Sequence, residues 1–152
     1  MEIPSREFPN GAVAFLRGHD INGKMLVFFD WGEMVIFHLP GCPPSIDGRL
    51  DTCYPTPLIK AHWNLYRGEP FDQDVLKLNE ADLAMLRVDL NGAKELAKLP
   101  DWKPIYYDDT AVVLAHRPER FPQLSKLTLP VQGPSIVGLG RVAFLDQSPR
   151  WK

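Results

Sequence analysis

Apolar and polar positions alternate along the chain in short blocks, and turn-forming residues separate these blocks. Residues 24–29 and 82–88 are almost continuously apolar over the length of a strand, which is typical of strands covered on both faces. Residues 102–107 and 111–116 are two further runs of strand length, and the Asp-Asp-Thr link at 108–110 predicts a hairpin between them. The pattern therefore predicts four strands, the last two antiparallel to each other.

Four other segments have apolar residues at helical spacing, with prolines or polar residues where a helix begins and glycines or prolines where it ends. They lie at 9–18, 32–39, 57–68 and 91–99. Strands that alternate with helices indicate a mostly parallel sheet with right-handed crossovers. We therefore predict an α/β domain over residues 8–117, with a mostly parallel, Rossmann-like sheet of four or five strands, flanking helices, and the antiparallel hairpin at its C-terminal edge.

The last 35 residues are rich in proline. The chain has 15 prolines, about twice the usual share of roughly 5%, and five of them follow residue 117. A helix is disfavoured there because proline lacks the backbone N–H donor. Residues 118–152 are predicted to be a partly irregular extension, in which 135–145 form one more strand or wrap the surface.

Composition excludes several classes of function. The net charge of −2 gives no attraction to nucleic acid or to an anionic membrane. No apolar run approaches the roughly 18 residues that cross a bilayer. The first ten residues lack the cationic and apolar regions of a signal peptide, so a location outside the cytoplasm would need another targeting segment.

Catalytic and cofactor motifs are also missing from the sequence. There is no G-x-S-x-G nucleophile motif, and the four histidines are scattered singly. His62 lies at helical spacing between apolar residues, which favours a packed side chain. Asp72 and Asp74 form a D-x-D spacing that twelve aspartates produce by chance. We expect no cofactor, no metal and no catalytic residue in this chain.

Two polar clusters fall where predicted strands end, the second after a brief extended piece at 45–47. Ligands of open α/β sheets bind beyond the carboxyl ends of strands. Two interpretations are open: a ligand or interface rim with Trp31 at least partly exposed, or an internal ion pair between Arg49 and an aspartate with Trp31 in the core. The rim residues of the first interpretation are Asp30, Trp31, Gly32, Asp47, Gly48, Arg49 and Asp51.

Four segments taken in order resemble a known family. They are "FPNGAVAFLR", "FFDWGEMVIFHLP", "SIDGRLDTCYP" and "WKPIYYDDTAVVLAHR". Together they look like the soluble C-terminal domain of bacterial polytopic membrane glycosyltransferases of the GT-C type, which are similar to dolichyl-phosphate-mannose–protein mannosyltransferases. Residues 28–32 are more distantly similar to the W-W-D-Y-G signature of the oligosaccharyltransferase catalytic subunit, with phenylalanines for both tryptophans and Trp31 for the tyrosine.

The resemblance implies an accessory domain on the extracytoplasmic, periplasmic face of a membrane protein. Such a domain recognises the acceptor or the lipid-linked sugar donor and is not catalytic by itself, because the family's catalytic carboxylate lies in the membrane part. Its partners would be that membrane-embedded part and possible lipid-linked sugar or acceptor ligands. The alternative is a structural domain that docks on its own membrane segment or on a partner protein.

The two cysteines, Cys42 and Cys53, flank the Asp47-Gly48-Arg49 turn. In an oxidising compartment a disulfide between them would close a short loop and contribute about 2–3 kcal/mol. The alternative is that they are ordinary buried apolar residues.

Overall fold

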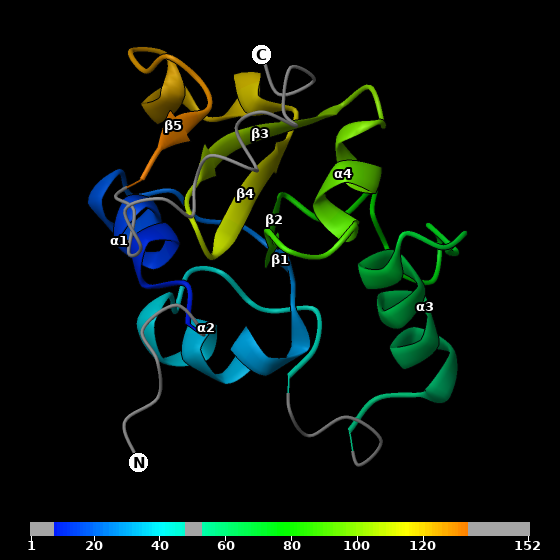
Figure 1. The fold of residues 1–152 in the computed structure, drawn as a ribbon. Helices are drawn as coiled ribbons and strands as arrows, with labels where there is room; N and C mark the ends of the chain where they lie inside the picture. The colour runs from blue at the N-terminus through cyan, green and yellow to red at the C-terminus, as the bar shows by residue number, and fades with distance from the viewer. Residues whose placement is uncertain (1–7, 48–52, 134–152) are drawn as a thin grey trace.

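The computed structural model describes residues 8–47 and 53–133 (Figure 1). The predicted segment at 135–145 lies outside these ranges. In chain order the elements are α1 Asn10–Gly18, β1 Met25–Val27, the 3-10 turn η2 Phe29–Trp31, α2 Gly32–His38, α3 Thr56–Arg67, β2 Leu83–Arg87, α4 Gly92–Ala97, β3 Trp102–Tyr107, β4 Ala111–His116, the 3-10 turns η4 Pro118–Arg120 and η5 Pro122–Leu124, and β5 Val131–Gln132.

The five strands form one mixed sheet in the order β1-β2-β4-β3-β5. β4 is antiparallel to both β2 and β3, whereas only the short pairs β1–β2 and β3–β5 are parallel. The prediction of a mostly parallel, Rossmann-like sheet is therefore wrong, and so is the placement of the hairpin at the edge. All six residues of β4 are buried, and a position in the middle of the sheet covers such a strand on every side.

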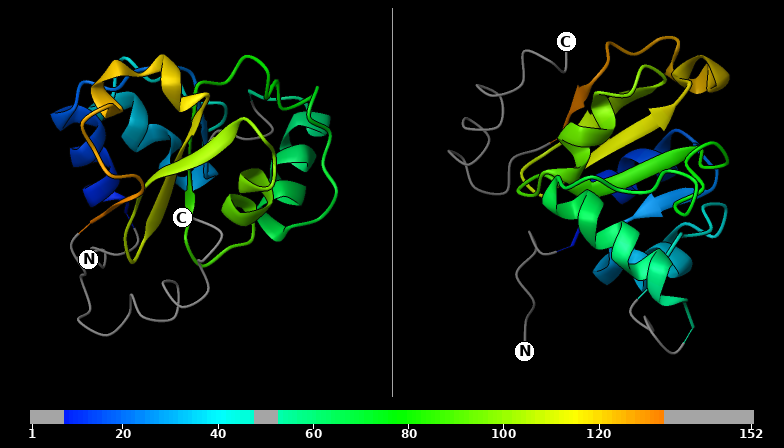
Figure 2. Two further views of the ribbon diagram at one scale, coloured as in Figure 1. Left: turned by 90° about the horizontal axis from the view of Figure 1, so that it is seen from above. Right: turned by 90° about the vertical axis from the view of Figure 1, so that its right-hand side faces the viewer.

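Helices cover the sheet on two sides (Figure 2). α1 contacts β3 and β4, while α4 contacts β2, β3 and β4 and carries α3 on its outer side. The left view of Figure 2 shows α1 and α2 on one side of the sheet and α3 and α4 on the other. The sheet is thus the middle layer of three.

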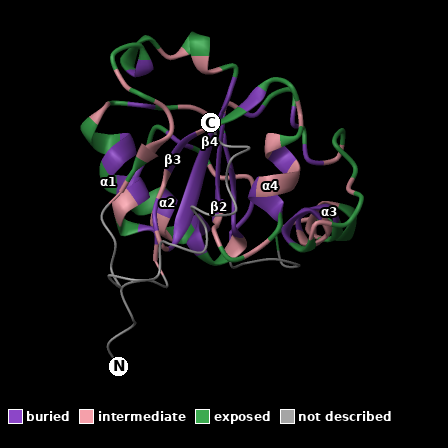
Figure 3. Ribbon diagram, turned by 45° about the horizontal axis from the view of Figure 1, so that its top comes forward, coloured by how far each residue is buried: buried purple, intermediate pink, exposed green. Residues whose placement is uncertain are grey.

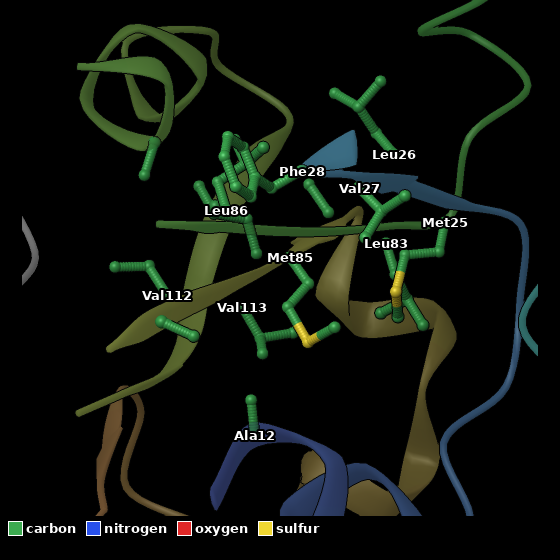
Figure 4. Close-up of a cluster of buried hydrophobic side chains, with 14 of the residues drawn as sticks. Ala12, Met25, Leu26, Val27, Phe28, Leu83, Met85, Leu86, Val112 and Val113 are labelled. Carbon is green, nitrogen blue, oxygen red and sulfur yellow. The ribbon is translucent and has the colours of Figure 1, made fainter. Parts of the chain in front are cut away.

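The core lies on both faces of β2 and β4 (Figure 3). Met85 of β2 pairs with Val113 of β4, and both point towards Ala12 of α1 in Figure 4. Leu86 and Phe28 lie on the opposite side of the sheet. Because β-strand side chains alternate between faces, neighbouring residues of β2 serve two different helix layers.

The predicted helices and hairpin are confirmed within a few residues. Gly68 ends α3 in the left-handed conformation, with φ of 78°, as a helix-terminating glycine does. β3 and β4 have the predicted bounds and flank the predicted turn. Among the described residues no helix has the length and apolarity needed to cross a membrane.

Candidate functional site

The carboxyl end of β1 is packed with aromatic rings. The ring of Phe28 lies 5.4 Å from that of Trp31 and 5.2 Å from that of Tyr66, between centroids. Phe29 and Trp63 pack at 4.7 Å, and Trp63 and Tyr66 at 5.6 Å. These five residues, called the aromatic cluster below, connect β1 and the start of α2 to α3.

Trp31 is only 1% exposed, so the prediction that it is at least partly exposed is wrong. The reason is local: the chain leaves β1 through η2, in which the Trp31 N–H donates to the Phe28 carbonyl at 2.9 Å, and the indole packs on the Phe28 ring. Asp30, by contrast, is exposed. Trp31 is therefore a core residue and cannot contact a ligand at a rim.

The two predicted polar clusters do meet, through Gly32 and Asp47. A Cβ atom placed on Gly32 would lie against the Ile46 carbonyl oxygen and 2.6 Å from Asp47 Cα, so only glycine fits there. Asp47 is 1% exposed, and the Tyr54 hydroxyl donates to its Oδ2 at 3.0 Å. Gly48, Arg49 and Asp51 lie outside the described residues, and the ion pair of Arg49 stays a prediction.

The extended piece predicted at 45–47 is a single bridge that lies slightly earlier in the chain. Pro44 bridges Met25 in parallel. The Met25 N–H donates to the Pro43 carbonyl at 2.9 Å, and the Ser45 N–H donates to the Met25 carbonyl at 2.8 Å. This segment therefore covers the outer edge of β1.

Ser45 also forms a hydrogen bond with His62 of α3. Its Oγ lies 2.8 Å from His62 Nε2, and His62 Nδ1 lies 2.9 Å from the Leu58 carbonyl oxygen. A carbonyl only accepts, so Nδ1 carries the proton and Nε2 accepts from the Ser45 hydroxyl. The Val27 N–H donates to the same hydroxyl oxygen at 3.2 Å.

A serine beside a neutral histidine is also the arrangement of a hydrolase nucleophile and its base. Here burial lowers the pKa of His62 to about 4, so the imidazolium that proton transfer would create is disfavoured. The Ser45 N–H already donates within the bridge, and the prolines at 43 and 44 have no N–H for an oxyanion. The pair is structural and ties α3 to the edge of β1.

His62 is 0% exposed, which confirms that it is a packed residue. Its partner was not predictable, because a separation of 17 residues between Ser45 and His62 has no periodic meaning.

A cavity of about 600 Å³ lies at the other, amino end of β1. Its walls come from β1, from residues 43–45 (the bridge segment), from the start of α3, and from the turn that precedes β2. They consist mostly of apolar side chains, with four polar exceptions: Lys24, Ser45, Lys77 and Glu80. Sequence reasoning missed this cavity because none of the four segments carries a motif of its own.

The predicted disulfide is not formed, and both cysteines are free thiols. Cys42 is buried, and its Sγ lies 3.6 Å from the Ile21 carbonyl oxygen. Cys53 is exposed near the start of α3. One thiol thus belongs to the core and the other to the surface.

The remaining acidic groups of the described residues do not form a metal site. Within residues 8–47 and 53–133 no three His, Cys, Asp or Glu side chains are placed to hold an ion. The Asp72 carboxylate accepts the N–H groups of Asp74 and Val75 at 3.0 and 3.1 Å, so it caps its own turn.

Comparison of the chain with family models, with curated proteins and with solved structures found no match. The similarity to membrane glycosyltransferases rests on the four sequence segments alone.

Proposed function

We propose that this chain supplies a non-catalytic docking domain to a polytopic membrane glycosyltransferase, on the extracytoplasmic face. The parent class comes from the resemblance of the sequence segments. The non-catalytic role is supported by the way the polar groups are used: Asp47 is buried against Tyr54, and Ser45 is engaged with His62 and Val27.

The observation that carries the docking role is the surface of α2. Phe37 is 85% exposed and the adjacent Ile36 is 47% exposed, and these are the exposed large hydrophobic side chains of the described residues. Val35 of the same helix is fully buried, so α2 is fixed to the core while Ile36 and Phe37 remain exposed on its outer side. Adjacent exposed apolar side chains of this kind are more favourable in contact with a membrane-embedded partner than in contact with water.

The test uses the full-length parent divided into its membrane part and this domain, co-purified in mild detergent. The double substitution Ile36→Ser with Phe37→Ser is expected to abolish co-purification while the melting temperature of the domain is retained. Glu33→Ser, which changes an exposed polar residue of the same helix, is the matched control and should leave co-purification intact. Undiminished co-purification of the double variant, or a parent without membrane spans, would contradict the proposal.

Recognition of the acceptor or of the lipid-linked donor is a second candidate. The observation that favours it is the exposed Asp30 at the carboxyl end of β1, whose carboxylate is able to accept hydrogen bonds from hydroxyl groups. Asp30→Asn in the full-length parent should then reduce transfer without changing the stability of the domain. Unchanged transfer would leave docking as the whole function.

A further inference from the structure

The cavity at the amino end of β1 has the dimensions of a small-molecule site. Its volume of about 600 Å³ falls within the roughly 300–1,000 Å³ typical of ligand pockets. Its apolar lining includes Met25 and Leu26 of β1, Leu58 of α3, and Val75 and Leu76 of the turn that precedes β2. A hydrocarbon group placed there is removed from water, which is favourable by about 25 cal/mol per Å² of apolar surface buried.

The walls are held in place by the fold itself. Four of the lining residues are prolines, at positions 43, 44, 55 and 57, and proline has a fixed φ. The bridge to Met25 and the hydrogen bond from Ser45 to His62 hold one wall. On the opposite wall the Leu76 N–H donates to the Asp72 carbonyl and the Ala81 N–H to the Lys77 carbonyl, both at 3.2 Å. A ligand therefore binds without first ordering the site.

The charges at the rim favour one negative group. Lys24 and Lys77 both line the cavity and are exposed, and neither ammonium group has an ion-pair partner among the described residues. Glu80 is the third charged residue of the lining, so two positive charges and one negative charge leave a net charge of +1. A ligand with a single negative charge matches this balance, whereas the Glu80 carboxylate repels a second negative charge.

We propose that this cavity binds an aliphatic carboxylate. The hydrocarbon chain lies against the apolar wall and the carboxylate lies at the rim with Lys24 and Lys77. This inference rests on the cavity alone and is independent of the docking role proposed for α2, because no residue that lines the cavity belongs to α2.

The test is calorimetric titration of the full chain with dodecanoate below its micelle concentration. One dodecanoate per chain is expected. Lys77→Gln should weaken binding about tenfold, because a charge-assisted hydrogen bond is lost. Lys103→Gln, which removes an exposed lysine of β3 outside the cavity, is the matched control and should bind like the unmodified chain.

Two further variants keep the test decisive if one of them folds poorly. Val75→Trp fills the cavity and should abolish binding. Pro57→Glu adds a negative charge to the wall at the first turn of α3, where the helix dipole favours an acidic residue, so the fold is retained while affinity falls.

Three results would overturn the proposal. Equal affinity for dodecanol would show that the lysines do not select an anion. Tighter binding of dodecyl phosphate than of dodecanoate would replace the carboxylate by a phosphate. Dodecanoate binding that survives both Val75→Trp and Pro57→Glu would place the ligand elsewhere.

Discussion

The two ends of β1 differ sharply although the strand has only three residues. At its carboxyl end the aromatic cluster closes the space between β1, α2 and α3, and Trp31 and Gly32 are buried there. At its amino end four segments meet without filling the space, which leaves the cavity and the exposed lysines. The residue types at the first end suggest a site, whereas those at the second end do not.

The comparison teaches that residue chemistry alone is a poor guide to an open surface. An indole beside a carboxylate suits a binding rim, yet the same indole is the largest apolar group available to fill a corner of a core. What decides between these roles is the backbone, because the 3-10 turn η2 places the Trp31 indole against Phe28 in the core. Substitutions at the two ends test this contrast.

Trp31→Ala should have the largest effect on stability. Removal of a buried indole leaves a cavity in the aromatic cluster, and the free energy of unfolding should fall by about 3–5 kcal/mol in urea denaturation. Asp30→Ala, at the exposed neighbour, is the control and should change it by less than about 0.5 kcal/mol. A loss below about 1 kcal/mol for Trp31→Ala would mean that the carboxyl end of β1 is not sealed.

His62, which ties α3 to the edge of β1, should make stability depend on pH. Its pKa is about 4 in the folded chain and 6.5 in the unfolded one, so the unfolded state binds more protons between these values. The stabilisation that neutral His62 contributes is complete above pH 6.5. It falls by roughly 3 kcal/mol as the pH falls to about 4. The measurement is the free energy of unfolding from pH 7.5 to pH 4, relative to His62→Gln, in which this part of the pH dependence is absent. Parallel curves for the two chains would show that His62 titrates normally.

Gly32→Ala should destabilise the chain by about 1–3 kcal/mol, because the added methyl group meets the Ile46 carbonyl and Asp47. Thermal and urea unfolding measure this loss. Gly18→Ala is the matched control: the added methyl group has no neighbour within 4 Å, so stability should be unchanged or slightly higher. If Gly32→Ala were equally harmless, residues 46 and 47 would not pack against the start of α2.

Much of the local structure is predictable from the sequence because its causes are local. Gly68 ends α3 through its left-handed backbone, and the run at 111–116 has no polar residue before His116, so it forms a buried strand. Strand order is not local. Whether β4 pairs with β2 depends on contacts between residues far apart, such as Leu83 with Ala115. The alternation of helices and strands favours parallel pairing. In the structure the burial of the β3–β4 hairpin outweighs this preference, and β4 pairs antiparallel with β2.

The candidate site was predictable only in part. The approach of Gly32 to Asp47 follows from the parallel pairing of β1 with the segment at 43–45 and was predictable. The burial of Trp31 depends on a single turn, and the cavity depends on four segments that share no motif. Side chains that face a hollow carry no periodic signal in the sequence.

The smallest expected effect concerns the thiols and tests how firmly the cavity wall is held. Cys42 adjoins the bridge segment, is fully buried, and has a pKa raised by burial, whereas Cys53 is exposed. Iodoacetamide should therefore modify Cys53 rapidly and Cys42 only after unfolding, since the buried thiol is protonated and inaccessible. Mass spectrometry of the time course counts the modified residues, and Cys53→Ser should leave no rapid phase. Rapid modification of Cys42 in the folded chain would mean that the segment at 42–45 opens from β1. The amino end of β1 would then lack the fixed wall on which carboxylate binding depends.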